Sequence, residues 1–252
     1  TTGLSQMDYW IGDEVVTPDW MAAQFSETVW RLPRTWVSYA DGDEVAPDDG
    51  EVGDARPLAL GSFNSLKKLT PGTVALWARC LDALPEAELF LKTKQLGDAA
   101  QRRRVEEGFA AHGVDPARLR LDDGSTTHAR ADHLAAYRRM DVALDPIGAM
   151  GGATTTCDAL WMGVPVVALP GDVPGARMSA SMLHGAGHPE WVAPDADAYV
   201  TKVCQLARDI GLRKNLRRDL RDQLRSQPLG DGAGLACALE DAFEEMIARW
   251  KR

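Results

Sequence analysis

The segment MGGATTTCDALWMG, residues 150–163, combines a double glycine, three threonines and an aspartate. Gly152 and the glycine before it allow a tight turn, and Thr154 and Thr155 would then occupy the first turn of a helix. A helix start offers free N–H groups and a partial positive charge, so this pattern suits a diphosphate. Asp158 shares the helical face of the threonines and could accept hydrogen bonds from a ribose. The pattern also fits an ordinary helix that is capped by a threonine and carries a solvated aspartate.

Two further segments carry basic side chains that could contact a phosphate or a base. SFNSLKKL, residues 62–69, ends an expected strand and contains Lys68, and a lysine there can reach a phosphate as a compact point charge. An exposed loop often carries such a pair of adjacent lysines as well. In ARADHLAAY, residues 129–137, Arg130 and His133 are three positions apart and share a helical face. They fit a base or phosphate site and a surface pair equally well.

From residue 56 onward, short apolar segments alternate with amphipathic ones. Strands are expected over residues 57–63, 89–94, 118–123, 141–145 and 165–171, and helices over residues 70–84, 98–113, 129–139, 154–162, 176–186, 195–209, 211–226 and 233–250. This alternation predicts an α/β fold, a Rossmann-like, doubly wound parallel sheet with helices on both faces. Ligands of such sheets bind at the carboxyl ends of the strands, which is where the three segments above would lie.

The first 55 residues follow a different pattern. Residues 18–32, with Pro18 in the first turn, predict a short amphipathic helix. Residues 41–55 are acidic, contain glycine and proline and show no periodicity, which is typical of a linker or a solvent-exposed loop.

Composition excludes several classes of protein. A net charge of −9 over 252 residues argues against a protein that coats a nucleic-acid backbone. No apolar run approaches the roughly 18 residues of a membrane span, so we expect a soluble, cytoplasmic protein without a membrane partner. The four cysteines have no metal-ligand spacing, and we expect reduced thiols packed as small apolar side chains.

Five segments resemble, in order, the C-terminal catalytic region of the O-linked N-acetylglucosamine transferase family, particularly bacterial members with tetratricopeptide repeats. They are residues 1–18, 63–85, 133–146, 151–172 and 177–192. The resemblance covers essentially the whole chain. It implies a GT-B fold, in which two Rossmann-like lobes hold a UDP-sugar between them, mainly through the C-terminal lobe. Residues 1–55 are then a remnant of the N-terminal lobe with a linker, and residues 56–252 form the UDP-sugar-binding domain.

The resemblance also implies roles for individual residues. Lys68 matches the lysine that binds the diphosphate and stabilises the leaving UDP. Thr154 and Thr155 match the pair that holds the phosphates, and Asp158 matches the carboxylate on the ribose.

At the uridine, His133 matches a histidine beside the uracil, and Arg130 stands where animal members have a lysine. Gly152 belongs to the glycine turn beside the diphosphate. Three positions depart from the animal enzymes at the same site, because Ser65 replaces a glutamine, Lys67 replaces a tyrosine and Ala153 replaces a histidine.

The function implied is that of an inverting, UDP-sugar-dependent protein glycosyltransferase. UDP-N-acetylglucosamine is the expected donor, although a related branch uses UDP-glucose, and a Ser or Thr of a protein or peptide is the expected acceptor. No metal and no cofactor besides the donor are expected, and this chain alone should bind UDP better than it catalyses transfer. Two alternatives stay open: a UDP-N-acetylglucosamine 2-epimerase on the same fold, and a non-catalytic UDP-binding or protein-interaction module.

Overall fold

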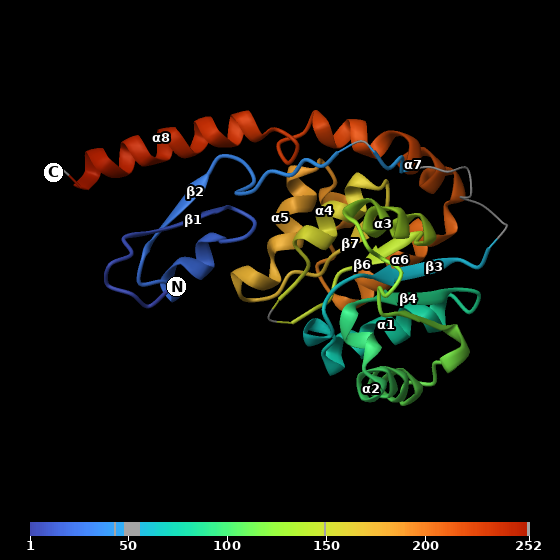
Figure 1. The fold of residues 1–252 in the computed structure, drawn as a ribbon. Coiled ribbons are helices and arrows are strands. Elements are labelled where there is room, and N and C mark those ends of the chain that lie inside the picture. Colours follow the sequence, from blue (N-terminus) through green and yellow to red (C-terminus); the bar gives the residue numbers. More distant parts are fainter. Residues whose placement is uncertain (43, 48–55, 149, 251–252) are drawn as a thin grey trace.

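A parallel sheet of five short strands forms the centre of the chain, shown in Figure 1 as a computed structural model that describes residues 1–42, 44–47, 56–148 and 150–250. The strands are β3 (Ala59–Ser62), β4 (Glu88–Lys92), β5 (Leu119–Asp122), β6 (Val142–Leu144) and β7 (Val166–Val167). Their order across the sheet is β5-β4-β3-β6-β7, and neighbouring strands run parallel. In the centre, Leu60 pairs with Leu89 and Val142, and all three side chains are fully buried. The predicted doubly wound α/β fold is confirmed.

Helices cover both faces of this sheet. They are α1 (Pro71–Ala83), α2 (Ala99–Ala110), α3 (Arg130–Ala135), α4 (Thr154–Trp161), α5 (Met178–Gly185), α6 (Ala196–Arg208) and α7 (Ile210–Arg225). Helices α4 and α7 lie above the strands in Figure 1 and α1 and α2 lie below them, while α6 packs against α1. Helix α1 shows why such segments fold locally: Thr70 caps its first turn, Pro71 occupies its first position, and Trp77 and Leu81 are buried on one stripe.

The strand order reverses between β3 and β6. The chain builds outward from β3 through β4 to β5 on one side, then returns to place β6 and β7 on the other side of β3. Because β3 and β6 are neighbours whose following segments lead to opposite faces, a crevice is expected at their carboxyl ends, and ligands of doubly wound sheets bind there. The segments after these two strands are residues 63–70 and 145–153.

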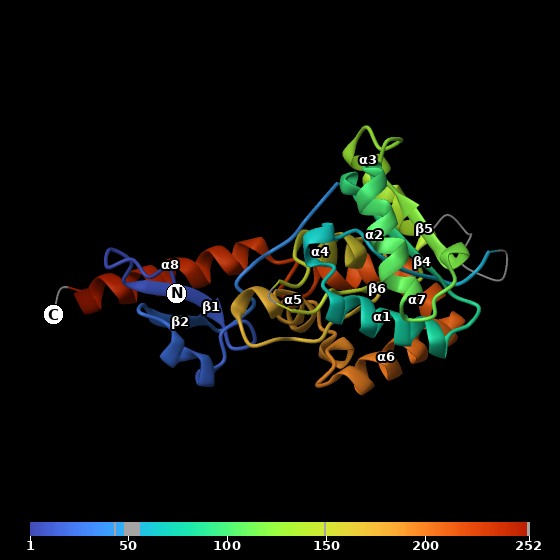
Figure 2. The same cartoon turned by 90° about the horizontal axis from the view of Figure 1, so that it is seen from below.

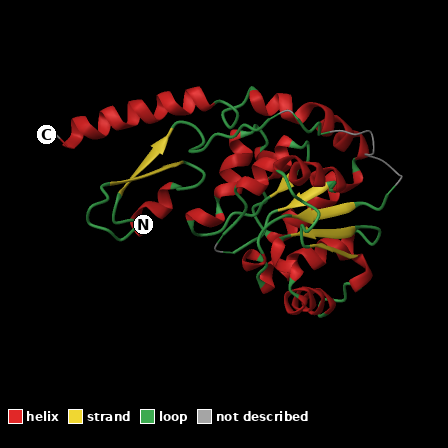
Figure 3. Ribbon diagram, viewed as in Figure 1, coloured by secondary structure: helices red, strands yellow, loops and turns green. Residues whose placement is uncertain are grey.

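The N-terminal residues form a separate small sheet, visible beside the main one in Figures 2 and 3. Strands β1 (Tyr9–Asp13) and β2 (Thr28–Leu32) run parallel, joined through a 3-10 helix, Asp19–Gln24. The long C-terminal helix α8 (Gly232–Trp250) packs on β2, where Leu32 meets Ala242 and Met246. The last helix of the chain therefore covers the first sheet and not the central one.

Two expectations are wrong in this part of the molecule. The helix predicted over residues 18–32 is instead a 3-10 turn followed by β2, because the β-branched and aromatic residues of Thr28–Leu32 pair with β1. Cys237 is exposed on α8, although the other three cysteines are buried as expected. Of the predicted acidic loop, residues 43 and 48–55 lie outside the described part of the chain. Within that part, no helix is both long and apolar enough to cross a membrane.

Candidate functional site

The segments after β3 and β6 meet through hydrogen bonds at the point where the strand order reverses. Lys68 ends a short 3-10 helix, Leu66–Lys68, and its Nζ donates to the Gly151 carbonyl at 2.6 Å and to Asn64 Oδ1 at 3.1 Å. Asn64 Oδ1 also accepts a hydrogen bond from Thr155 Oγ1 at 3.1 Å. The structure therefore brings Lys68 together with the glycine turn and with the start of α4, as the sequence predicts.

The ammonium group of Lys68 has neutral partners. Both of its hydrogen-bond acceptors, the Gly151 carbonyl and the Asn64 amide oxygen, carry no formal charge. The side chain is half-buried, and this burial lowers the pKa of Lys68, although Asp145 opposes the shift through space. A partly desolvated ammonium with neutral partners is well suited to bind an added anion.

The first turn of α4 has no side-chain cap. Its N-cap residue is Ala153, whose methyl group cannot accept a hydrogen bond from the N–H groups behind it. Thr154 is exposed, and Thr155 is half-buried with its hydroxyl donating to Asn64. The alternative of a helix capped by threonine is therefore wrong, and the start of α4 remains available to an anion.

A buried carboxylate holds the glycine turn in place. Asp145 is 3% exposed, and its Oδ1 accepts the backbone N–H of Gly152 at 2.5 Å. Burial raises the pKa of Asp145 to about 6, against the opposing hydrogen bonds from Ser179 and Gly152. A Cβ atom at Gly152 would lie 2.5 Å from Asp145 Oδ1, so the close approach of turn and carboxylate requires a glycine.

One helical turn further along α4, Asp158 is buried and surrounded by donors. Tyr39 Oη donates to Oδ1 at 2.6 Å, Arg130 Nη1 donates to Oδ2 at 3.0 Å, and His133 Nε2 lies 3.3 Å from Oδ2. Burial by itself would raise the pKa of Asp158, but the hydrogen bonds from His133, Arg130 and Tyr39 outweigh it and lower the pKa. This aspartate is not the solvated residue of the alternative interpretation.

Arg130 is the most connected of these donors. Besides Asp158, it contacts Asp41 through Nε at 2.8 Å and donates to Tyr39 Oη at 2.7 Å. Hydrogen bonding to Asp158 raises the pKa of Arg130 further, despite an opposing contribution from burial. Arg130 and His133 are therefore not an isolated surface pair, because both converge on one carboxylate.

The other predicted site residues have distinct surroundings. Ser65 caps the 3-10 helix and donates to Gln95 Oε1 at 2.8 Å, so its hydroxyl is engaged away from Lys68. Gly152 and Ala153 form the turn into α4 described above. Among the described residues, no cluster of three or more His, Cys, Asp or Glu side chains is arranged to hold a metal ion.

The sequence analysis did not single out several residues of this region, among them Asn64, Lys92 and Tyr39. Asn64 stood inside the quoted SFNSLKKL segment, where its link between Lys68 and Thr155 could not be foreseen. Lys92 contacts His133, with 3.2 Å between Nζ and Nδ1, and the only signal for it was a charged residue inside the apolar segment LFLKTK. Tyr39 reaches Asp158 from outside the central sheet, and no motif marked it.

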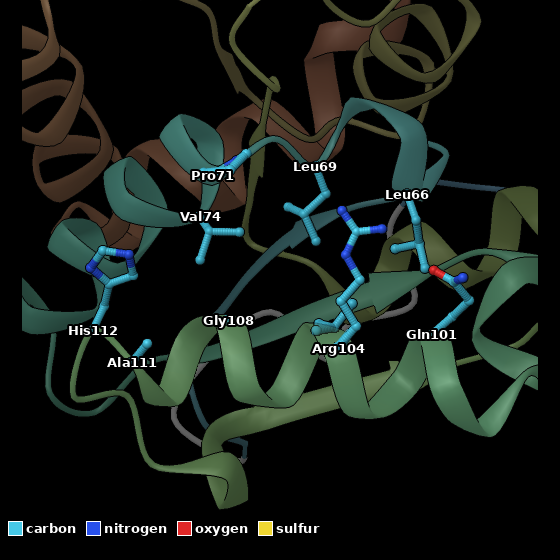
Figure 4. Close-up of a pocket in the computed structure, with 10 residues that line it drawn as sticks. Leu66, Leu69, Pro71, Val74, Gln101, Arg104, Gly108, Ala111 and His112 are labelled. Carbon is cyan, nitrogen blue, oxygen red and sulfur yellow. The ribbon is translucent and has the colours of Figure 1, made fainter.

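A separate hollow of about 290 Å³ lies between the start of α1 and helix α2 (Figure 4). Its walls include Leu69 and Val74 on one side and Gly108 on the other, with Arg104 reaching across from α2. It contains none of the predicted site residues. The candidate site is therefore the region around Lys68, Thr155 and Asp158, at the ends of β3 and β6.

The parallel sheet, its reversed strand order and a site at the reversal are those of a doubly wound α/β domain, and the likeness to solved glycosyltransferases gives its class as GT-B. A sucrose-phosphate synthase from Thermosynechococcus elongatus shares this fold, with a TM-score of 0.59 over 96% of this chain and 59% of that chain at 15% identity. A likeness at that identity concerns the fold alone.

The chain belongs to glycosyl transferase family 41, whose family model matches residues 55–234. It is 35% identical over its whole length to a probable UDP-N-acetylglucosamine–peptide N-acetylglucosaminyltransferase, SPINDLY, of Petunia hybrida, of which it covers 26%. A mutant of the Thermobaculum terrenum O-GlcNAc transferase superposes with a TM-score of 0.83 at 36% identity, over 95% of this chain and 45% of that one. The predicted family resemblance is confirmed, and the chain spans about a quarter of the length of the plant relative.

Proposed function

We propose that this chain is the donor-binding half of an inverting protein glycosyltransferase that uses a UDP-sugar. The proposed donor is UDP-N-acetylglucosamine and the proposed acceptor is a Ser or Thr hydroxyl of a protein. The names of the Petunia relative and of the Thermobaculum enzyme support this choice, since both describe N-acetylglucosamine transfer. Residues 1–55 would then belong with the N-terminal lobe and residues 56–252 with the donor domain.

One observation carries the proposal: Lys68 donates to neutral oxygens beside a helix start that has no side-chain cap. A diphosphate between them would supply the negative charge that neither hydrogen-bond acceptor of Lys68 carries. In this assignment Thr154 and Thr155 hold the phosphates with their hydroxyls, and Gly152 lets the backbone approach. We call Asn64, Lys68 and residues 151–155 the phosphate end of the site.

The reaction would proceed in one displacement. The acceptor oxygen attacks the anomeric carbon, the bond from that carbon to the UDP oxygen breaks, and the acceptor proton passes to a base outside the residues assigned here. The leaving UDP gains negative charge, which Lys68 and the partial positive charge of α4 stabilise. Because these groups supply positive charge themselves, we propose that the reaction needs no metal ion.

The nucleoside would lie one helical turn further along the same face of α4. We assign Asp158 to the ribose hydroxyls, His133 to the uracil and Arg130 to the uridine, and call these residues with Tyr39 the uridine end of the site. Since Tyr39 and Arg130 hydrogen-bond to Asp158, the ribose must replace part of their contacts when it binds.

Replacing Lys68 by alanine tests the proposal. We expect UDP to bind this chain measurably in isothermal titration calorimetry, and Lys68→Ala to weaken that binding about tenfold. In the full protein that contains this chain, transfer from UDP-N-acetylglucosamine to a Ser/Thr peptide should fall by about 10²-fold or more, as for the loss of an oxyanion donor.

Lys67→Ala is the matched control, because Lys67 is the adjacent, exposed lysine. It should behave as wild type. Unchanged transfer by Lys68→Ala would remove Lys68 from the mechanism. UDP binding without any transfer by the full protein would instead favour a non-catalytic UDP-binding module.

A further inference from the structure

A buried lysine stands behind the uridine end. Lys92 ends strand β4 and is 6% exposed, with its Nζ 5.3 Å from the centroid of the Phe63 ring. Among the described residues, no carboxylate lies within ion-pair distance of this ammonium, and its hydrogen-bond partner is His133. Burying a lysine in this way is unfavourable, as the lowered pKa of Lys92 reflects, so the contact with His133 calls for an explanation.

The contact determines which nitrogen of His133 carries the hydrogen. An ammonium group has three donors and no lone pair, so Nδ1 of His133, 3.2 Å from Lys92 Nζ, must accept. In the neutral ring the hydrogen is then on Nε2, which lies 3.3 Å from Asp158 Oδ2 and can donate to it. Donors and acceptors alternate along the line from Lys92 through His133 to Asp158.

We propose that Lys92 is a positioning residue that holds His133 as the tautomer with its hydrogen on Nε2, directed at Asp158. The role in nucleotide binding rests on the proposed function, because it matters only if a nucleotide binds at Asp158. Both ring nitrogens are then engaged within the protein, and His133 can offer a base only the face of its ring. The charged and titratable groups around the ring are Lys92 from β4, Asp158 from α4, Arg130 from α3, and Tyr39 and Tyr137.

The packing around the imidazole supports a fixed orientation. Phe63 lies 5.8 Å from it, and Tyr137 lies edge-on at 5.6 Å, centroid to centroid. These rings restrict the tilt of His133 but cannot choose its tautomer, because they offer no strong hydrogen-bonding group to its nitrogens. That choice falls to the groups at the two nitrogens: Lys92, which donates to Nδ1, and Asp158, which accepts from Nε2.

¹⁵N NMR of the His133 imidazole tests the proposed tautomer directly. In protein labelled with ¹⁵N-histidine at pH 8, two-bond ¹H–¹⁵N spectra distinguish the two neutral tautomers, and the signals of His133 are assigned by their loss in His133→Gln. We expect the wild type to show hydrogen on Nε2 and an unprotonated Nδ1. Lys92→Met should produce a mixture of tautomers, and Lys67→Met, an exposed lysine, should leave the spectrum unchanged. Hydrogen on Nδ1 in the wild type would overturn the proposal without any variant.

UDP affinity supplies the second measurement. Lys92→Met should weaken UDP binding about tenfold, because His133 no longer donates steadily to Asp158, and Lys92→Arg should restore most of the affinity and the tautomer. Wild-type affinity in Lys92→Met, with its tautomer altered, would refute the functional part of the inference. If the wild-type chain binds no UDP, the proposed function fails, while the tautomer of His133 can still be read from the spectrum.

Discussion

At the phosphate end of the candidate site, Lys68 donates to two neutral oxygens, whereas at the uridine end Arg130 contacts two carboxylates, Asp41 and Asp158. In the first arrangement the ammonium has no ion-pair partner and only the through-space influence of Asp145, whereas in the second the positive charge is paired directly within the protein. An anion can therefore be added at the phosphate end without breaking an ion pair. A ribose at the uridine end must exchange existing contacts of Asp158 for new ones.

The carboxylates of the two ends show the same contrast. Burial dominates at Asp145 and raises its pKa to about 6, while hydrogen bonds from His133, Arg130 and Tyr39 outweigh burial at Asp158 and lower its pKa. The buried carboxyl group of Asp145 thus resists ionisation beneath the glycine turn, whereas the buried carboxyl group of Asp158 ionises more readily beside Arg130. The difference teaches that burial alone does not decide the charge of this site; the donors around each oxygen do.

The largest expected effect concerns Asp145 and pH. Because its folded pKa of about 6 exceeds the ordinary 3.8, the folded chain holds this proton more tightly, and the contribution of Asp145 to stability is present at low pH and is lost as pH rises from about 4 to about 6. The shift of this pKa from 3.8 to about 6 corresponds to about 3 kcal/mol in the free energy of unfolding. In urea unfolding, Asp145→Asn should gain about that much stability relative to wild type between pH 4 and pH 7.

Comparing variant with wild type at each pH cancels the other titrating groups. Asp82→Asn, on the exposed side of α1, is the matched surface control for the substitution itself. A difference between Asp145→Asn and wild type that stays constant over this range would mean that Asp145 ionises normally, and the contrast between the two carboxylates would be lost.

A smaller effect is expected at Asp158. Its lowered pKa means that its contribution to stability is present above the ordinary 3.8 and is lost as pH falls below that value. Asp158→Asn should therefore lower the free energy of unfolding at pH 7 by about 1–2 kcal/mol, a modest value because Arg130 is partly exposed and keeps Asp41 as a partner.

Lys68→Ala is the counterpart from the phosphate end, and urea unfolding should show a stability close to that of wild type. Since both of its hydrogen-bond partners are neutral, its removal breaks no ion pair, and Asp145 loses only a through-space attraction to the ammonium. Equal destabilisation by both variants would show that the two ends do not differ in how they balance charge.

The sequence predicted the phosphate end better than the uridine end, for a physical reason. Lys68 and Thr155 lie in segments that directly follow β3 and β6, so strand alternation and the rule for parallel sheets place them together. Tyr39 and Asp41 reach the site from a segment before the central sheet, and such long-range contacts leave no local pattern. Strand β2 was missed likewise, because its pairing with β1 overrides the amphipathic pattern of residues 18–32.

The family resemblance assigned roles to site residues that the pattern of residue types could not assign. From residues alone, Lys68 looked like an ordinary loop lysine, and Arg130 and His133 like a possible surface pair. The resemblance assigned all three to one nucleotide site, and the structure places them along α4 within contact of Gly151 or Asp158. Neither the residue pattern nor the family resemblance assigned a role to Lys92, since it acts through His133.

The central claim is that Lys68 and the start of α4 bind the diphosphate of UDP. A crystal structure of this chain with UDP tests it most directly. We predict the diphosphate oxygens about 3 Å from Lys68 Nζ and from the first N–H groups of α4, with the ribose hydroxyls on Asp158. A nucleotide bound in the hollow between α1 and α2, or a diphosphate with Lys68 turned away from it, would contradict the assignment.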